Sequence, residues 1–333
     1  MNLHLFLVVF TSALTALLLG FPMCRLSVKF HFLDIPGSAP HKSHRQPVPL
    51  CGGLVVVLST GIAGLAFGAF SLATVRAILL SALIAFFFGL WDDVHELSST
   101  WKLAGQFLAT TCLILLGIKI QLFDQLPWLD YLLTYLWMVG ITNAYNFVDS
   151  MDGLVTGLAG LAAAFFTLAA SNSHQGDLLL LGTILVGVCA GIFYFTAAPA
   201  KFFWGDSGAQ YMGFVLAGLA IAYSPKGLLR IQSWYVPILL MGVPIFDTVL
   251  VVLSRLRHGR SVYRAGFDHT YHRLVALGML TNRAVLTMHF ASFLLSCIAF
   301  VTLLLPPLAA NAVFVAVVLG GFAGILFLDR TRT

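Results

Sequence analysis

The sequence predicts an all-α integral membrane protein, a bundle of about eleven transmembrane helices that forms one domain over residues 1–333. Hydrophobic residues make up 59% of the 333 positions, and charged residues make up only 9%, against roughly 25% charged residues in a soluble domain. Apolar runs close to the roughly 20 residues that cross a bilayer recur along the whole chain. Lipid is therefore the expected solvent for most of it.

The opening run, residues 3–23, is expected to be the first membrane helix. It resembles a secretion signal, but no Lys or Arg precedes it and no small-x-small cleavage site follows. The later helices are expected wherever an apolar run ends at Gly, Pro or a charge, and small residues such as Gly157 and Gly187 favour their close packing. The expected helices cover residues 3–23, 50–70, 76–90, 103–118, 129–142, 154–170, 178–196, 211–223, 234–253, 285–305 and 309–328.

Lys and Arg predict the orientation, because cytoplasmic loops carry an excess of them. With eleven spans, all but four of the 18 Lys and Arg residues fall on one face. That face is expected to be cytoplasmic, with the N-terminus outside and the C-terminus inside. The net charge of +5 then reflects topology and needs no nucleic-acid partner. The four exceptions are Arg76, Lys119, Lys226 and Arg230.

The acidic residues gather on the same face, although acids do not determine topology. Function is the leading explanation for this second asymmetry. The five cysteines stand singly, which predicts neither a disulfide framework nor a thiolate metal site. The acids on the other face are Asp124, Asp130 and Asp177.

Asp92 and Asp93 lie just after the run 76–90, at the expected cytoplasmic end of that helix. Adjacent carboxylates repel each other, and a divalent cation or a shared proton relieves that repulsion. A solvated helix end is the alternative interpretation.

A polar row follows the run 129–142, with Asn143, Asn146, Asp149 and Asp152 at every third position. In a helical or 3₁₀ turn these side chains share one face, which suits a sugar, a uracil edge or a hydrated metal. A helix cap explains one of the carboxylates but not the spaced set.

Gly205-Asp206-Ser207-Gly208 precedes the run 211–223. Glycines on both sides of Asp206 and Ser207 allow close backbone approach, and N–H groups at a helix start favour phosphate oxygens. By itself, such a turn is equally well explained as an ordinary connection.

The loop after the run 234–253 is rich in Arg and His, among them Arg264, His269 and His272. Guanidinium and imidazole groups are suitable donors to a diphosphate. The arginines also suit topology or anionic lipid head groups. Asp247, inside the run, is either a functional carboxylate or part of a structural ion pair.

Together these segments resemble the polyprenyl-phosphate N-acetylhexosamine-1-phosphate transferase family, most closely its N-acetylglucosamine branch. The motifs are Pro-x-Pro-Leu-x-Gly-Gly at 47–53, the acidic pair, the polar row, the Gly205–Gly208 turn and Asp268-His269-x-x-His272. The resemblance implies a helical membrane bundle with a cytoplasmic-face site in the bacterial inner membrane. It implies transfer of a sugar-1-phosphate, most simply GlcNAc-1-phosphate, from a UDP-N-acetyl sugar to undecaprenyl phosphate with release of UMP, the first membrane step of a cell-wall or lipopolysaccharide pathway.

The resemblance also implies roles for residues. Asp206 matches the Mg²⁺ ligand, with Asp92 assisting and Mn²⁺ as a substitute ion; Asp92, Asp93 and Asp149 match catalytic carboxylates. A homodimer is a further expectation. The expected substrate-binding residues are Lys42, Arg45, Asn143, Asn146, Asp152, Arg264, His269 and His272.

Three positions depart from the family pattern: Ser150, Thr196 and Tyr271. They place the donor sugar in question more than the reaction. The alternatives are a phospho-N-acetylmuramoyl-pentapeptide-type transferase, a secondary transporter and an intramembrane aspartyl protease. One-sided acids argue against a transporter, which needs charge on both access faces, and a protease leaves the polar row and the histidines unexplained.

Overall fold

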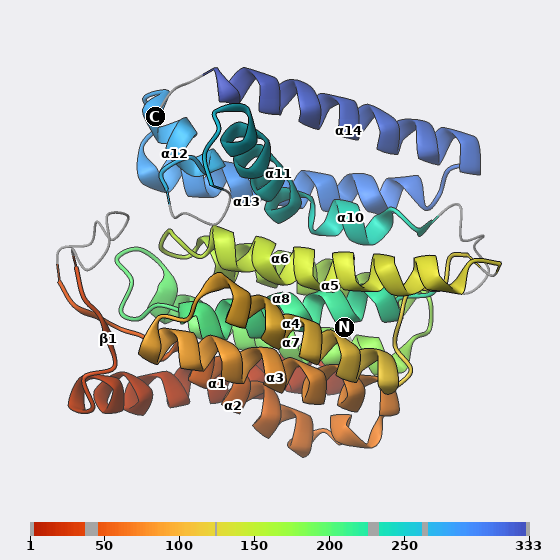
Figure 1. Ribbon diagram of the computed structural model, residues 1–333. Coiled ribbons are helices and arrows are strands. Elements are labelled where there is room, and N and C mark those ends of the chain that lie inside the picture. The colour runs from red at the N-terminus through yellow and green to blue at the C-terminus, as the bar shows by residue number, and fades with distance from the viewer. Residues whose placement is uncertain (1–2, 37–45, 124, 226–232, 262–265, 331–333) are drawn as a thin grey trace. The chain divides into compact units, whose positions relative to one another are not determined.

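The structure is a computed structural model that describes residues 3–36, 46–123, 125–225, 233–261 and 266–330. It is helical apart from one short antiparallel pair, β1 (Leu33–Asp34) with β2 (Val48–Pro49). The chain divides into two compact units: unit 1 is residues 1–35 and 46–226, and unit 2 is residues 36–45 and 227–333. Figure 1 shows the helices of each unit.

Unit 1 is a bundle in which α8 is the central helix. Every residue of α8 from Ser207 to Ala220 is buried, which is typical of a helix that is apolar on all sides. α3 and α5 pack against α8, and α1 packs against α7. The helices of unit 1 are α1 (Leu3–Lys29), α2 (Gly52–Ala66), η1 (Ala69–Ser71), α3 (Ala73–His95), α4 (Ser99–Leu115), α5 (Pro127–Val148), α6 (Leu154–Asn172), α7 (Gly176–Thr196) and α8 (Gly205–Ala222).

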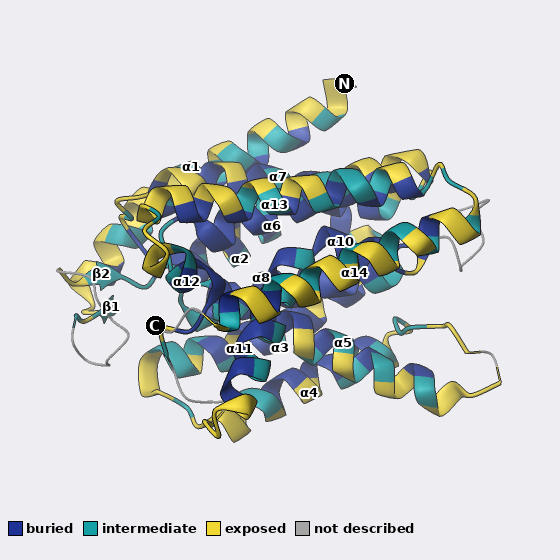
Figure 2. Ribbon diagram, turned by 90° about the horizontal axis from the view of Figure 1, so that it is seen from above, coloured by how far each residue is buried: buried dark blue, intermediate teal, exposed yellow. Residues whose placement is uncertain are grey.

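Unit 2 contains the remaining helices. Apolar residues stay exposed along α13 and α14 (Figure 2), as expected for helices that meet lipid. A small core forms where Leu250 of α11 meets Ile325 and Leu328 of α14. The helices are α10 (Val236–Leu240), α11 (Gly242–Arg257), α12 (Thr270–Ala276), α13 (Thr281–Thr302) and α14 (Pro307–Asp329).

The all-helical membrane class is confirmed, and six described helices are long and apolar enough to cross a membrane. The expected helix 234–253 is wrong as one element, because the chain breaks between α10 and α11. Pro244 lies in the first turn of α11, where a missing N–H costs no helical hydrogen bond. α12 was not predicted. The six candidate spans are α1, α3, α6, α7, α13 and α14.

Two boundary differences affect the site. α8 begins at Gly205, earlier than the expected start at 211, so Asp206 lies in its first turn. α5 continues to Val148, so Asn143 and Asn146 belong to its last turns and not to a loop.

Candidate functional site

One end of unit 1 collects polar side chains from four helices. Asp92 and Asp93 lie at the end of α3, and Asn146 lies at the end of α5. Lys102 and Asp206 lie in the first turns of α4 and α8. Because α3 and α5 run opposite to α4 and α8, these starts and ends meet at the same end of the bundle.

Lys102 connects two of the carboxylates. Its Nζ lies 2.5 Å from Oδ2 of Asp92 and 2.5 Å from Oδ2 of Asp206. Asn146 is a further hydrogen-bond partner of Asp206, and the other oxygen of Asp92 accepts the Leu97 N–H at 2.6 Å. The side chain of Asp206 keeps 26% of its surface exposed, so a ligand can reach this group. We call Asp92, Lys102, Asn146 and Asp206 the charge cluster.

Asp93 holds the start of α8. Its Oδ1 accepts the Asp206 N–H at 2.7 Å, and its Oδ2 accepts the Ser207 N–H at 3.1 Å and the Ser207 hydroxyl at 2.6 Å. A carboxylate from another helix thus satisfies N–H groups that a helix start leaves without partners. In this geometry one oxygen of Asp93 holds the Asp206 backbone and the other holds Ser207. The catalytic role that the resemblance implied for Asp93 stays a prediction.

Glycines bring three helices close enough for these contacts. A Cβ on Gly53 of α2 would lie 2.2 Å from the Ser207 Oγ, and one on Gly89 of α3 would lie 2.6 Å from the Ser207 Cα. Gly52 and Gly53 also donate backbone hydrogen bonds to the Phe203 and Trp204 carbonyls, at 3.0 and 2.9 Å. The Gly-Gly motif therefore lets α2 pack closely against the turn that carries Asp206.

The polar row does not form one surface. Asn143 bonds to Gln106, with Nδ2 to Oε1 at 2.7 Å, while Asn146 contacts Asp206. Asp152 accepts the Ala200 N–H at 2.9 Å and so fixes the connection that precedes α8. The three side chains thus have different partners: the connection before α8 for Asp152, Gln106 for Asn143 and Asp206 for Asn146. Their expected substrate-binding roles stay predictions.

Asp149 is the C-cap residue of α5. Burial raises the pKa of its carboxyl well above the usual value, and the negative charges of Asp206, Asp93 and Asp34 raise it further. Asp149 is therefore suited to retain a proton at a pH where an ordinary carboxyl is ionised.

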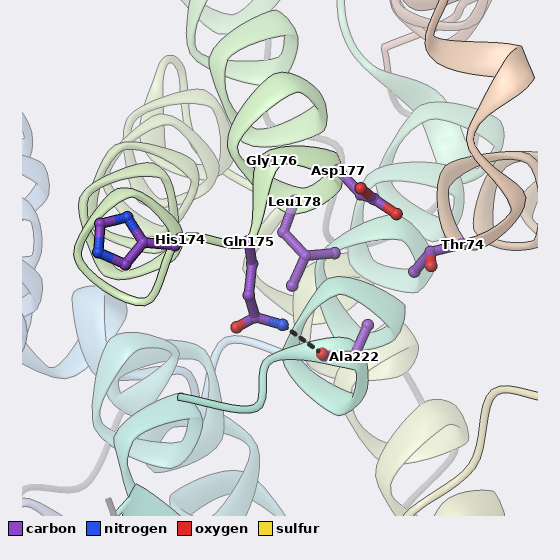
Figure 3. Close-up of a pocket in the computed structure, with 7 residues that line it drawn as sticks. All are labelled: Thr74, His174, Gln175, Gly176, Asp177, Leu178 and Ala222. Atoms are coloured by element: carbon purple, nitrogen blue, oxygen red, sulfur yellow. Dashed lines mark hydrogen bonds between the residues drawn. The ribbon is translucent and has the colours of Figure 1, made fainter. Parts of the chain in front are cut away.

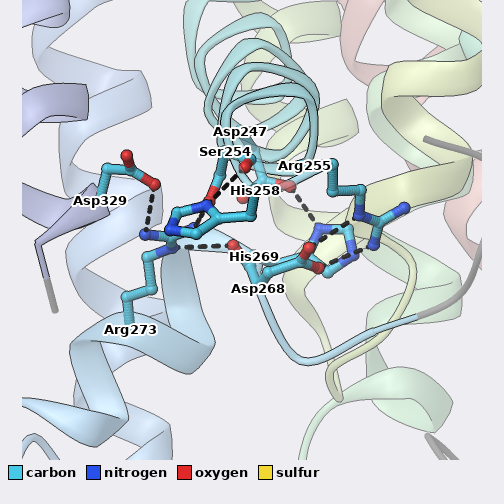
Figure 4. A network of polar contacts seen from close by, with 8 residues as sticks. All are labelled: Asp247, Ser254, Arg255, His258, Asp268, His269, Arg273 and Asp329. Atoms are coloured by element: carbon cyan, nitrogen blue, oxygen red, sulfur yellow. Dashed lines mark hydrogen bonds and ion pairs between the residues drawn. The ribbon is translucent and has the colours of Figure 1, made fainter. Parts of the chain in front are cut away.

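The histidine segment lies in unit 2, where Asp247 organises it (Figure 4). Oδ2 of Asp247 lies 2.8 Å from Nδ1 of His269, and its Oδ1 accepts the Thr270 N–H at 2.6 Å. Asp247 is completely buried, so it is one half of a structural ion pair or hydrogen bond with His269. Burial, together with the nearby His269, lowers the pKa of His272 to about 4. The two histidines of the motif are therefore not equivalent.

Two arginines complete this network. The Arg255 guanidinium makes a bidentate pair with Asp268, with both N–O distances 2.7 Å. Burial alone raises the pKa of Asp268, but Arg255 outweighs burial and holds it below the usual value. Arg273 donates to the Ser254 hydroxyl and to the Leu328 carbonyl, both at 2.7 Å, which joins α12 to the ends of α11 and α14.

Some predicted positions are not brought to either cluster. Lys42, Arg45 and Arg264 lie outside the described residues. Thr196 is buried and shares a hydrogen bond of 2.8 Å with Thr156, so at this departure from the family pattern the side chain packs inside unit 1.

A separate cavity of about 230 Å³ lies at the opposite end of unit 1 (Figure 3). Thr74, at the start of α3, and Ala222, the last residue of α8, both line it. The other ends of those helices carry Asp92 and Asp206. The cavity is therefore separated from the charge cluster by the length of the bundle.

The donor set of the charge cluster is suited to a hard cation. Among the described residues, no group of three or more His, Cys, Asp and Glu side chains is arranged to hold a metal ion. Mg²⁺, however, commonly takes only one or two protein carboxylates and obtains its other ligands from water and substrate phosphates. Asp92 and Asp206 already converge on one cationic group, Lys102.

Sequence reasoning treated Lys102 only as a topology residue and did not consider Gln106 or Gln210. A usable signal was their spacing: Lys102 and Gln106 stand four residues apart, as do Asp206 and Gln210. Side chains at i and i+4 share one helix face. A charged residue followed by an amide on the same face of two membrane helices marks a polar surface between them.

Comparisons with known proteins identify the family. Residues 75–224, which include the charge cluster, match the model for glycosyl transferase family 4. The chain is 30% identical over 298 residues, 87% of its length and 82% of the relative's, to a probable undecaprenyl-phosphate N-acetylglucosaminyl 1-phosphate transferase of Bacillus subtilis.

Two other relatives represent different branches. The chain is 30% identical to the decaprenyl-phosphate N-acetylglucosaminephosphotransferase of Mycobacterium tuberculosis, over 86% of this chain and 80% of the relative. It is also 30% identical to the phospho-N-acetylmuramoyl-pentapeptide-transferase of Shouchella clausii, over 70% of this chain and 78% of the relative. The family predicted from the motifs is thereby confirmed, and this multi-pass membrane protein belongs to glycosyl transferase family 4.

Proposed function

We propose that this protein transfers N-acetylglucosamine-1-phosphate from UDP-N-acetylglucosamine to a polyprenyl phosphate, at the cytoplasmic side of a bacterial inner membrane. The observation that carries this proposal is the convergence of Asp92, Asp206 and Lys102 at one end of unit 1. That cluster lies within the segment that matches the family. The relatives with N-acetylglucosamine in their names cover more of this chain than the pentapeptide transferase does.

The reaction joins two anions. An oxygen of the lipid phosphate attacks the phosphorus that carries the sugar, and the bond from that phosphorus to the bridging oxygen breaks, so that UMP leaves with that oxygen. The second pKa of a phosphomonoester is about 6, so the nucleophile is largely ionised near neutral pH. Repulsion between the anions is then the principal obstacle, and fixed cationic groups reduce it.

Lys102 supplies a fixed positive charge at this point. In the free protein its ammonium group pairs with both Asp92 and Asp206. Asp206 and Asp92 would hold Mg²⁺, with Mn²⁺ as a substitute ion, and the bound ion would offset the charge of the diphosphate and of the leaving UMP. Asp93 keeps Asp206 in place, and the raised pKa of Asp149 suits that carboxyl to exchange a proton with the lipid phosphate.

His269, with Arg264, Lys42 and Arg45, is proposed to bind the diphosphate and nucleotide. The bond from Asp247 to Nδ1 of His269 fixes the ring orientation, as a carboxylate does for a histidine that acts on a ligand. His272 lies near His269, and its ring is neutral at neutral pH because its pKa is about 4. These roles, like the homodimer, stay predictions.

The test is UMP release by the purified protein in detergent with undecaprenyl phosphate and Mg²⁺. Three donors are compared: UDP-N-acetylglucosamine, UDP-N-acetylgalactosamine and UDP-N-acetylmuramoyl-pentapeptide. We expect the first donor to react and Asp206→Asn to lose roughly 100-fold or more in rate. The matched control is Asp130→Asn. Asp130 is a buried carboxylate away from the charge cluster. Its Oδ1 accepts the Leu122 and Phe123 N–H groups, and an asparagine oxygen still accepts both.

Each outcome has a distinct meaning. Reaction with only the muramoyl-pentapeptide donor would place the chain in the other branch. Release of UMP without Mg²⁺ or Mn²⁺ would refute the metal roles of Asp206 and Asp92. A folded protein that releases no UMP from any donor would refute the proposed function and return attention to transport.

A further inference from the structure

Three amides lie one helical turn from the charge cluster; we call Gln106, Asn143 and Gln210 the amide layer. Gln106 and Gln210 are buried and Asn143 is half-buried. Nε2 of Gln106 lies 3.2 Å from Oδ1 of Asn143 and 3.3 Å from Oε1 of Gln210. In return, Nδ2 of Asn143 donates to Oε1 of Gln106 at 2.7 Å and to the Val139 carbonyl at 2.8 Å. Gln106 and Gln210 are each only 1% exposed.

The amide layer repeats the charge cluster one helical turn further into the bundle. On α4, Gln106 follows Lys102 by four residues, and on α8, Gln210 follows Asp206 by four. On α5, Asn143 precedes Asn146 by three. Residues at these spacings lie above one another on one helix face. Each amide therefore lies one helical turn from one member of the charge cluster on the same helix.

Side chains connect α4 and α8 at both of these levels. The upper connection is Lys102 to Asp206 and the lower one is Gln106 to Gln210. The upper connection must change when a cation or a diphosphate enters, because Lys102 then has to share the two carboxylates. The lower connection contains no ionisable group and its two side chains are buried, so the entry of a charged ligand does not require it to change.

We propose that Gln106, Asn143 and Gln210 are positioning residues that hold α4, α5 and α8 in the register at which Lys102, Asn146 and Asp206 meet, and so place Asp206 and Lys102 beside Asp92 of α3. This inference rests on the proposed function and goes beyond it, because none of the three amides needs to touch a substrate. Apolar side chains in their place would pack in several registers. An amide group left without partners in an apolar interior is costly, so the reciprocal amide pairs favour one register.

The test replaces the whole layer by apolar residues of similar size, in the triple variant Gln106→Met, Asn143→Leu and Gln210→Met. Removing all partners together leaves no orphaned amide, so we expect a melting temperature close to that of the wild type. The first readout is Mn²⁺ binding, followed by electron paramagnetic resonance without substrates. We expect the dissociation constant to rise roughly tenfold or more, as when groups that orient metal ligands are removed.

The second readout is UMP release. We expect kcat to fall roughly tenfold or more while KM for the UDP-sugar stays within about twofold. A folded triple variant with wild-type Mn²⁺ binding and wild-type kcat would overturn the proposal, because the amides would then serve packing alone. Gln106→Asn covers the case in which the triple variant does not fold. This variant keeps the amide, but its side chain is one methylene shorter, so the amide is moved away from Asn143 and Gln210. Normal Mn²⁺ binding in that variant would equally overturn the proposal.

Gln175→Met is the matched control. Gln175 also joins helices through its amide, because Nε2 donates to the Ala222 carbonyl at 3.2 Å and Oε1 accepts the Ser224 N–H at 3.0 Å. It lies at the opposite end of unit 1, beside the cavity in Figure 3. We expect this variant to lower the melting temperature and to leave Mn²⁺ binding unchanged. Wild-type protein that binds Mn²⁺ but releases no UMP would refute the proposed function and still allow the amide layer to be judged by its effect on Mn²⁺ binding.

Discussion

Asp93→Asn tests whether this carboxylate holds the start of α8 or acts as a base. The wild-type side chain accepts three hydrogen bonds, one from Asp206 N and two from Ser207. An asparagine has one acceptor oxygen. If that oxygen stays with Ser207, the Asp206 N–H faces an NH₂ group and is left without a partner.

The expected loss follows from these contacts. An unsatisfied buried N–H costs about 1–3 kcal/mol, and removing a negative charge from a helix start costs about 0.3–1 kcal/mol more. We therefore expect Asp93→Asn to lower the free energy of unfolding by roughly 2–4 kcal/mol. The matched variant is Asp92→Asn, which keeps the start of α8 capped. The asparagine oxygen can still accept the Leu97 N–H, so the change mainly weakens the ion pair with Lys102, whose ammonium side is partly exposed and which is worth about 0–1 kcal/mol.

The assay compares the melting temperature of both variants in detergent, by tryptophan fluorescence, with the pH profile of UMP release. A positioning role for Asp93 predicts a clearly lower melting temperature in Asp93→Asn than in Asp92→Asn, and a pH profile with an unchanged shape. Equal melting temperatures, together with loss of the acidic limb of the profile in Asp93→Asn alone, would refute this reasoning and identify Asp93 as the base.

Two further predictions concern packing and acid stability. Gly53→Ala would place a Cβ 2.2 Å from the Ser207 Oγ, so thermal unfolding should show that the free energy of unfolding falls by about 1–3 kcal/mol. Gly61→Ala is the control in the same helix, because its added Cβ meets nothing within 4 Å, and it should be neutral or stabilising. Equal effects of the two variants would contradict the close approach of α2 to Ser207. The pKa of His272 is about 4 in the folded protein and about 6.5 in an unfolded chain, so the unfolded state binds more protons between these values. The free energy of unfolding therefore falls as the pH is lowered through this window, by less than the roughly 3 kcal/mol of a fully buried group because solvent screens the partly exposed ring. In His272→Gln the melting temperature should depend less on pH between about 6.5 and 4. His174→Gln is the control, because His174 is exposed, and its melting temperature should follow that of the wild type. Parallel curves for all three proteins would exclude His272 as the cause of the loss of stability in acid.

Much of the molecule was predictable because lipid imposes strong constraints on sequence. Unpaired backbone groups are costly in hydrocarbon, so a long apolar run such as residues 178–196 has to be helical, and the structure places α7 at Gly176–Thr196. The family was also predictable, because motifs such as Gly205-Asp206-Ser207-Gly208 stay contiguous in the chain. Asp206 was singled out for the same reason.

Contacts between distant segments were decided only by the tertiary structure. Lys102 and Asp206 are 104 residues apart. Local spacing marks a polar face on each helix, but it does not say that the two faces meet. Asp93 looked like a partner of Asp92 in one site, yet neighbouring residues on a helix point in different directions. Asp92 therefore faces Lys102, and Asp93 faces the backbone of α8.

The same distinction separates Asn143 from Asn146. Their spacing correctly placed them on one helix face, but spacing along one helix carries no information about what lies opposite. α4 presents Gln106 to Asn143, and α8 presents Asp206 to Asn146. The sequence by itself determined that these helices exist and which faces are polar, because both depend on the local period of the chain. Which polar groups pair depends on how the helices pack around α8, and only the tertiary structure decided that.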